Sequence, residues 1–377
     1  MATVLVISFT DLKQDPRVRR QIEALRTHHA VIAAGTGDPA MSDVRFLGCK
    51  RNARTFTRRC VGGIKLLSRR YESHYWSREH VQELHRKLEG VAFDTVIAND
   101  VEALPLALSL AGTRPVILDA HEYAPRELEE RLVWRLFHQG HAHYLCKTYI
   151  PKTARVITVA DGIAEEYRRL LGVKPVVIQN AAPSHILAPR ATPTRPIRMI
   201  HHGYAMPTRQ IEKMIEVMQW VDDRFELDLM LVPNFPEYIQ KLKAKASGNP
   251  RVRFLSPVSM EALVPFTNAY DIGLYLLSPS SFNNLHALPN KFFEFLQARL
   301  AVAIGPSPEM AKIVREFGCG VVAKDFAPAS LARALNHLTS SDIDRMKAGS
   351  ERAAQTHTAE RNAEKLGQVV ADVLGEL

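Results

Sequence analysis

Residues 281–310 restrict the fold of this chain more than any other segment of its sequence. Pro289 suits the first turn of a helix, because its φ angle is fixed and it has no N–H group to leave unpaired. From Asn290 onward apolar residues recur at helical spacing, and a short apolar run at 300–304 then ends at a glycine-proline pair. Such a run is typical of a strand buried in a parallel sheet. The order loop, helix, strand, loop, helix therefore predicts an α/β domain.

The start of this predicted helix carries chemistry suited to a phosphorylated ligand. A loop that enters a helix presents unpaired backbone N–H groups and the positive end of the helix dipole, where phosphate binds well. Lys291 adds a cation in the first turn, and Glu294 adds a carboxylate that can accept hydrogen bonds from sugar hydroxyls. A surface Lys–Glu pair on an ordinary amphipathic helix explains the same two residues, so both interpretations stay open.

Residues 289–310 (PNKFFEFLQARLAVAIGPSPEM) resemble the donor-binding segment of family four retaining glycosyltransferases, which have the GT-B fold. The pattern in that family is P-N-K-x-x-E-x-x-x-x-G-x-P-V-V, followed by a helix that begins with P-E. The last Glu of its Glu-x7-Glu motif binds the ribose of a sugar nucleotide, and Glu294 matches it. His286 stands where the first Glu is expected, and Arg299 and Ala301 replace the common Gly and Pro. The departure at His286 matters, because that Glu usually contacts the transferred sugar.

Length and composition indicate a two-domain globular protein. The chain has 377 residues, of which 46% are hydrophobic and 24% charged. No apolar run approaches the ~20 residues of a transmembrane helix, and the run at 4–9 lacks the basic leader of a signal peptide. We therefore expect a cytoplasmic protein, with peripheral attachment to the inner face of the cell membrane as an option. The four cysteines form no C-x-x-C pair, which predicts free thiols rather than a zinc site.

The net charge of +9 lies almost entirely in the first half of the chain. Residues 1–190 hold 28 Lys and Arg against 20 Asp and Glu, and the remainder holds 21 against 20. Residues 50–70 carry eight basic residues and no acid, interleaved with apolar ones. A pair of exposed basic helices is one interpretation, and a surface for an anionic membrane or an acidic acceptor is the other. The expected contacts of that surface are Arg58, Arg59, Arg69 and Arg70. We do not expect a nucleic-acid partner, because no RRM, KH or OB signature accompanies the basic residues.

The first half alternates short apolar runs with helical spacing, which is typical of a parallel sheet. Strands are predicted at 3–9, 30–34, 93–98, 115–119, 155–160 and 174–179. Asp15 is a suitable N-cap for a first helix with Pro16 at its first position. The first loop lacks G-x-G-x-x-G, so the dinucleotide fingerprint is absent.

A polar cluster, D-A-H-E, follows the predicted strand at 115–119. Parallel α/β folds place their chemistry just beyond the carboxyl ends of strands. The family that the chain resembles commonly has D-x-H-[DE] here, which implies that His121 faces the donor sugar. Asp119 and Glu122 are expected to orient it, and His121 and Glu122 are the predicted catalytic residues. A loop histidine satisfied by its local hydrogen bonds is the alternative.

Residues 181–196 contain four prolines and little apolar periodicity, which indicates a linker. We predict an N-terminal Rossmann-like domain on the acceptor side at 1–183, a linker at 184–196, and a C-terminal Rossmann-like domain on the donor side at 197–358. The resemblance implies that the last helix, 359–377, crosses back to the first domain. The expected fold is α/β, of the GT-B type, with two Rossmann-like domains whose parallel sheets face an interdomain cleft.

The second domain is predicted to begin with a strand at 197–201, a loop that ends at Arg209, and a helix over 210–221. Arg209 and Lys213 are four residues apart, so they would place two cations on one face of the helix start. The resemblance implies that both bind the donor diphosphate, whereas an ordinary surface helix is the alternative. The resemblance implies further donor-binding roles for Val258, Asn283, Asn284, His286 and Asn290. A D-x-D triplet at 342–344 follows two serines at a predicted helix start, which favours an N-cap over a metal site.

These patterns predict glycosyl transfer, with retention, from a nucleotide-diphosphate sugar to a glycan, lipid-linked or otherwise acidic acceptor, in polysaccharide or glycoconjugate biosynthesis. The nucleotide sugar is the donor substrate. We expect no permanently bound cofactor and no metal, because cations and a helix N-terminus can stabilise the leaving diphosphate. Two alternatives stay open: a nucleotide-sugar epimerase on the same fold, and a GT-B binding or scaffold subunit without catalysis. The departure at His286 is the reason for the second.

Overall fold

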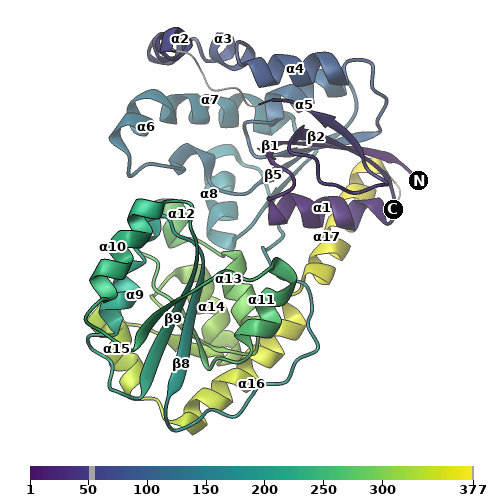
Figure 1. Ribbon diagram of the computed structural model, residues 1–377. Helices are drawn as coiled ribbons and strands as arrows, with labels where there is room; N and C mark the ends of the chain where they lie inside the picture. Colours follow the sequence, from purple (N-terminus) through teal and green to yellow (C-terminus); the bar gives the residue numbers. More distant parts are fainter. Residues whose placement is uncertain (51–55, 376–377) are drawn as a thin grey trace. The chain divides into compact units, whose positions relative to one another are not determined.

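The computed structural model describes residues 1–50 and 56–375, and the chain divides into two compact units (Figure 1). Unit 1 comprises Met1–Gln179, Ser281–Asn283 and Asn362–Leu377, and unit 2 comprises Asn180–Ser280 and Asn284–Arg361. Each unit is a parallel sheet covered by helices, which is the α/β class that the sequence predicts. Within the described ranges, no helix is long and apolar enough to cross a membrane.

Unit 1 contains a seven-stranded parallel sheet with the order β3-β2-β1-β4-β5-β6-β7. Its strands are β1 (Thr3–Asp11), β2 (Ala30–Thr36), β3 (Arg45–Gly48), β4 (Thr95–Asn99), β5 (Val116–Ala120), β6 (Arg155–Thr158) and β7 (Val176–Val177). The direction of winding reverses between β1 and β4, and such a reversal opens a crevice at the carboxyl ends of the strands. β4 and β5 pair so that Asn99 lies beside Asp119. Polar residues that follow these two strands are therefore brought together.

The helices of unit 1 cover both faces of this sheet (Figure 1). They are α1 (Pro16–Arg26), α2 (Phe56–Leu67), α3 (Tyr71–Trp76), α4 (Glu79–Leu88), α5 (Leu104–Ala111), α6 (Leu132–Phe137), α7 (Gln139–Tyr149), α8 (Asp161–Leu171) and α17 (Ala359–Leu374), with 3-10 turns η1 (Ala124–Arg126) and η2 (Ile150–Lys152). α1 and α17 share one core with the sheet, to which α17 contributes Leu366, Val369 and Val370. Asp15 caps α1 as predicted, because its side chain accepts from the backbone N–H groups of Arg17 and Val18.

Unit 2 contains a six-stranded parallel sheet with the order β10-β9-β8-β11-β12-β13. Its strands are β8 (Ile197–Tyr204), β9 (Phe225–Val232), β10 (Val252–Leu255), β11 (Ile272–Tyr275), β12 (Ala301–Ile304) and β13 (Gly320–Val322). Its helices are α9 (Glu212–Val217), α10 (Pro236–Ala246), α11 (Met260–Thr267), α13 (Asn290–Gln297), α14 (Pro308–Phe317), α15 (Pro328–Asn336) and α16 (Ser340–Thr356), and α12 (Phe282–Leu285) begins in the segment grouped with unit 1. The winding reverses between β8 and β11, and open α/β sheets commonly bind ligands at the carboxyl ends of strands beside such a reversal.

The structure corrects several predicted elements. The helix expected over 210–221 is wrong at its start: residues Pro207–Arg209 form a 3-10 turn (η3), Gln210 has a φ of 48°, and α9 begins only at Glu212. A left-handed residue cannot continue a right-handed helix, so Arg209 and the following helix are separate. The strand expected over 174–179 is reduced to β7, and the stretch after Pro328 forms three helices.

The D-x-D triplet lies at a helix start, as predicted, but the N-cap of α16 is Thr339. Asp342 completes a capping box with Thr339, and Asp344 accepts a hydrogen bond from the backbone N–H of Thr192. Both carboxylates therefore have structural partners.

Candidate active site

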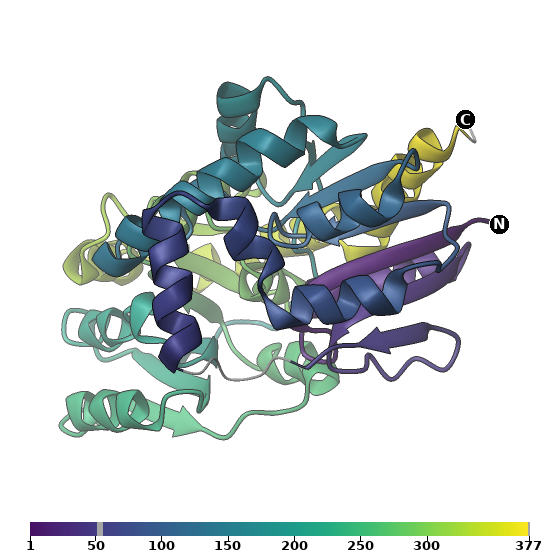
Figure 2. The same cartoon turned by 90° about the horizontal axis from the view of Figure 1, so that it is seen from above.

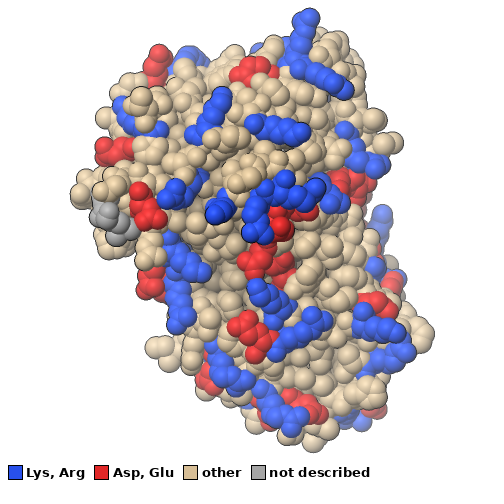
Figure 3. All heavy atoms as spheres, turned by 180° about the vertical axis from the view of Figure 1, so that it is seen from behind, with Lys and Arg blue, Asp and Glu red and all other residues tan. Residues whose placement is uncertain are grey.

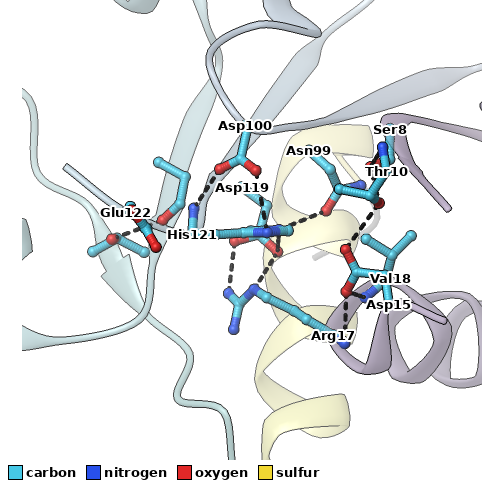
Figure 4. Close-up of polar contacts among 12 residues, drawn as sticks. Ser8, Thr10, Asp15, Arg17, Val18, Asn99, Asp100, Asp119, His121 and Glu122 are labelled. Carbon is cyan, nitrogen blue, oxygen red and sulfur yellow. Dashed lines mark hydrogen bonds and ion pairs between the residues drawn. The ribbon is translucent and has the colours of Figure 1, made fainter. Parts of the chain in front are cut away.

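His121 lies at the centre of a polar network at the carboxyl ends of β4 and β5 (Figure 4). Its Nε2 is 3.1 Å from Oδ1 of Asn99, and its Nδ1 is 3.3 Å from Oδ2 of Asp100. The backbone N–H of His121 also donates to Oδ1 of Asp100, at 2.9 Å. Both ring nitrogens therefore face oxygen atoms, and the ring is held in one orientation.

Asp119 lies beneath this histidine, but its main partners are on α1. The guanidinium of Arg17 donates to both carboxylate oxygens, from Nη2 at 2.6 Å and from Nε at 3.0 Å. Gln21 donates to the same carboxylate at 3.0 Å and accepts from the amide of Asn99 at 2.9 Å. Oδ2 of Asp119 is 3.8 Å from Nε2 of His121, and Gln21 and Asn99 also connect the two residues by hydrogen bonds.

The predicted catalytic residue Glu122 is exposed, one residue beyond His121. It accepts a hydrogen bond from Nδ2 of Asn283 at 3.2 Å, while Oδ1 of Asn283 accepts from the backbone N–H of Tyr123 at 2.9 Å. Asn283, predicted to bind the donor, thus lies against the loop after β5. Sequence reasoning missed four contributors to this network: Arg17, Gln21, Asn99 and Asp100. The signal for the last two was their position directly after a predicted strand.

In unit 2, Tyr275 at the end of β11 lies next to two predicted donor-binding cations. Nη1 of Arg209 is 3.5 Å from the hydroxyl of Tyr275, and Nζ of Lys291 is 4.8 Å from the centre of its ring. Gly203, at the end of β8, has a φ of 122°, and a Cβ there would lie 3.0 Å from Nζ of Lys291. Glycine at this position therefore leaves room for the ammonium group.

Lys291 is half-buried, and it makes no ion pair or hydrogen bond with any residue that the structure describes. Burial and the charge of Arg209 lower the pKa of Lys291 to about 7, although Glu294 opposes the shift. The charges of Arg209 and Lys291 are close enough to interact, and Lys291 makes no ion pair with a described residue, so an anion bound here would be stabilised.

Glu294 lies one turn further along α13, near a buried histidine of β8. Oε2 of Glu294 is 3.7 Å from Nε2 of His202, and burial together with the charge of Lys291 lowers the pKa of His202 to about 3. His202 is therefore neutral, and it packs edge-on against Phe295. The side chain of Glu294 is 17% exposed, and its carboxylate oxygens are groups that can accept hydrogen bonds from hydroxyl groups.

Comparison with known proteins gives a match to solved structures. No protein-family model matches the sequence, and no curated protein is similar enough to count as a match. Sucrose-phosphate synthase from Thermosynechococcus elongatus is 14% identical, with a TM-score of 0.77 and complete coverage of both chains. HepE from Anabaena, in complex with UDP and glucose, is 13% identical with a TM-score of 0.71, over 99% of this chain and 100% of that one.

A trehalose-6-phosphate protein from E. coli, bound with UDP-2-fluoro glucose, is 10% identical with a TM-score of 0.71, over 99% of each chain. The chain has the GT-B fold. At such identities the likeness shows the fold alone, and the chemistry has to be argued from this chain's own residues.

His286 has a carboxylate partner on α14. It stands at the position where the resemblance to GT-B glycosyltransferases leads us to expect a Glu. Its Nδ1 is 3.1 Å from Oε1 of Glu309, the second residue of α14. Glu309 is buried, and the dipole of α14 favours a negative charge there. A carboxylate is thus present beside position 286, although it comes from a different helix.

The remaining predicted donor residues of the GT-B chain are less closely connected. Asn284 donates to the hydroxyl of Ser280 at 2.8 Å, and Asn290 is the first residue of α13. In the described part of the chain, no hydrogen bond or ion pair joins Lys213 or Val258 to Arg209, Lys291 or Glu294. Their donor-binding roles therefore remain predictions. Within the same ranges no group of His, Cys, Asp and Glu could hold a metal ion.

Proposed function

We propose that this chain transfers a sugar from a nucleotide-diphosphate sugar to an acceptor, with retention. The observation that carries the proposal is the pair of cations, Arg209 and Lys291, beside Tyr275 at the carboxyl ends of two neighbouring strands. A diphosphate would provide the ion pair that Lys291 makes with no described residue. Groups fixed in place before reaction can stabilise the charge that develops on a leaving diphosphate.

The other residues have roles that follow from their positions. Glu294 accepts from the ribose hydroxyls, and His121 contacts the transferred sugar. The bond from the anomeric carbon to the diphosphate oxygen breaks with its electron pair on the diphosphate. The acceptor hydroxyl forms the new bond and gives its proton to the departing phosphate. Two of the GT-B structures were solved with UDP-glucose or its 2-fluoro analogue, so UDP-glucose is the first donor to test.

Calorimetric titration with UDP-glucose, followed by measurement of UDP release, tests this proposal. A glycosyltransferase binds the donor and releases UDP faster when an acceptor is present. An epimerase interconverts the sugar without an acceptor, and a scaffold subunit binds without turnover. Failure to bind any nucleotide sugar in a donor screen would refute the transferase and the epimerase.

Replacing His121 by alanine is expected to slow sugar transfer about 100-fold or more, the lower range for a positioned catalytic side chain. Affinity for UDP should change by less than about twofold, because the UDP contacts proposed above are in unit 2. Steady-state kinetics and calorimetry on the same preparation measure both effects. His28→Ala, at an exposed histidine after α1, is the matched control. Lost UDP affinity with normal turnover would contradict the placement of His121.

We also propose that α2 and α6 attach the chain to an anionic membrane. These two helices contact each other and expose large apolar side chains: Phe56, Val61, Ile64 and Leu67 on α2, and Leu132, Val133 and Leu136 on α6. α2 and the helices that follow it lie along one side of unit 1 (Figure 2). An apolar strip with neighbouring arginines suits a membrane surface. A lipid-linked glycan, or another acidic acceptor, would be reached from the same surface.

The basic residues do not form one continuous field over the whole molecule. On the face drawn in Figure 3, Lys and Arg are interspersed with Asp and Glu. Arg58 is paired with Glu79 across to α4, and the remaining predicted contacts are Arg59 on α2 and Arg69 and Arg70 just beyond it. Three arginines are therefore expected to act on an anionic surface, together with the apolar strip.

Replacing Arg59, Arg69 and Arg70 by serine, together with Arg58, is expected to weaken binding to anionic vesicles by at least about tenfold, since each cation near such a surface contributes roughly 1 kcal/mol. Sedimentation with vesicles of phosphatidylglycerol and phosphatidylcholine measures the loss, and vesicles of phosphatidylcholine alone are the control. Ile64→Ser with Leu136→Ser should reduce the residual binding further. If the parent protein does not sediment with anionic vesicles, the proposed membrane attachment is wrong.

A further inference from the structure

A pocket of about 340 Å³ opens in unit 1 beside His121. The carboxyl ends of β1 and β4, the loop after β5, and helices α6 and α7 supply its walls. Four carboxylates line it, from Asp100, Glu102, Glu122 and Glu127. Among the described residues, no Lys or Arg lines it. Because His121 and Glu122 belong to the same wall, a ligand here would lie next to the residues proposed to act on the sugar.

Three of these carboxylates already have partners. Asp100 accepts from the backbone N–H of His121 at 2.9 Å, Glu102 is paired with Arg78 at 2.9 Å, and Glu122 accepts from Asn283 at 3.2 Å. The side chain of Glu127 differs, because it makes no hydrogen bond or ion pair with any described residue. Burial, and the charges of Glu122, Asp100 and Glu102, raise the pKa of Glu127 to about 8, so its carboxyl group is largely protonated in the empty pocket at pH 7, and a bound cation would favour the ionised form. The surrounding carboxylates thus keep Glu127 protonated, and no described Lys or Arg lines the pocket to oppose them.

A second, independent feature of the pocket is an unsatisfied buried histidine. His141 on α7 lines the pocket and is only 5% exposed, and its Nε2 has no hydrogen-bond partner among the described residues. Burial, and the nearby His74, lower the pKa of His141 to about 4, so its ring is neutral. A buried polar atom without a partner is costly, and a ligand hydroxyl or amino group that displaced the atoms covering this nitrogen would satisfy it.

An aromatic side chain completes the pocket. Trp134, on α6, is among the lining residues. The face of an indole packs against the C–H groups of a sugar ring and also attracts a cation. Carboxylate, neutral imidazole and indole together suit a sugar that carries a positive charge.

We propose that this pocket binds an acceptor sugar with a protonated amino group, in which Glu127 pairs with the ammonium group and Trp134 packs against the ring. This proposal rests on the proposed function, because it names the acceptor class for the same transfer. An anionic sugar would lie against the carboxylates of Asp100, Glu102 and Glu122, with no lysine or arginine among the described lining residues, and like charges repel. The acidic acceptor suggested by the basic stretch therefore concerns the surface of α2, and the reacting end of the acceptor in the pocket is cationic.

The experiment compares three matched sugars in the presence of saturating UDP: D-glucosamine, D-glucose and D-glucuronate. Measured by saturation-transfer NMR or calorimetry at pH 7, glucosamine should bind at least about fivefold more tightly than glucose, and glucuronate should bind most weakly. Glu127→Gln should reduce the affinity for glucosamine to that for glucose. Glu127→Lys should reverse the order of affinities, so that glucuronate binds most tightly. Glu130→Gln, three residues away and outside the lining, should leave the order unchanged.

Equal affinities for glucosamine and glucose in the parent protein would overturn the proposal, and so would a glucosamine preference that survives Glu127→Gln. UDP-glucose binding is measured separately on each variant. Normal donor binding without an amine preference refutes this inference alone. An amine preference without donor binding refutes the proposed transfer and leaves the cationic pocket ligand standing.

Discussion

Replacing Arg17 by methionine is expected to lower the free energy of unfolding of unit 1 by about 3–5 kcal/mol, because the change leaves a buried carboxylate without its cation. The side chains of Arg17 and Asp119 are 10% and 3% exposed, and two hydrogen bonds join them. Arg17 also donates to the carbonyl of Ile178 at 2.9 Å, so the same guanidinium ties the end of the unit-1 sheet to α1. Gln21 would remain as a partner of Asp119 but carries no charge.

Hydrogen exchange of peptides from β4 and β5, measured against urea concentration, reports this loss in unit 1 specifically. Arg26→Met is the matched control, since Arg26 ends the same helix and pairs with Asp43 on the surface, where such pairs contribute about 0–1 kcal/mol. The double variant Arg17→Met/Asp119→Asn should recover part of the loss, because it removes the stranded charge. If the single variant is as stable as the control, Asp119 is not held by Arg17 in the way described.

Replacing Lys291 by methionine is expected to weaken UDP-glucose binding about 10- to 100-fold at pH 6, since a charge-assisted hydrogen bond contributes about 1.5–3 kcal/mol. The effect should shrink as the pH rises. Burial and Arg209 lower the pKa of Lys291 to about 7, so the ammonium is present before binding only below that pH. Above pH 7 a proton must be taken up on binding, and the affinity of the parent protein should fall by up to about tenfold per pH unit.

UDP-glucose is the ligand for this measurement, because its diphosphate has no ionisation near neutral pH. Two further variants locate the diphosphate and the ribose. Arg209→Ala should weaken UDP far more than uridine, since only UDP carries phosphate, whereas Glu294→Gln should weaken both, since both carry ribose. A pH-independent affinity in the parent protein, with unshifted values in these variants, would rule out the donor assignment.

The helix and strand of residues 290–304 could be predicted from the sequence because their signals are local. The helical spacing after Pro289, the apolar run before the glycine-proline pair, and the positions of Lys291 and Glu294 depend on neighbours within a few residues. The same holds for Asp15, which caps α1 through N–H groups two and three residues away. The parallel α/β class followed from the alternation of such local patterns.

Other features depend on residues that are distant in sequence. Arg17 and Asp119 are separated by 102 positions, and His286 and Glu309 by 23. The sequence marks Tyr275 only as a strand residue, whereas the fold places Arg209 and Lys291 beside it. No spacing rule reports these pairs, because the order of strands in the sheet, rather than the order of residues in the chain, decides which side chains meet.

The charge of the pocket beside His121 shows most clearly which features depend on sequence and which on tertiary structure. The sequence by itself determined an α/β protein with a helix after Pro289 and a basic first half. Only the tertiary structure decided that Asp100, Glu122 and Glu127 converge on one pocket without a described Lys or Arg in its walls. Net charge sums over the whole chain, whereas a ligand responds to the few groups within several ångströms of it, since charges beyond about 10 Å are largely screened.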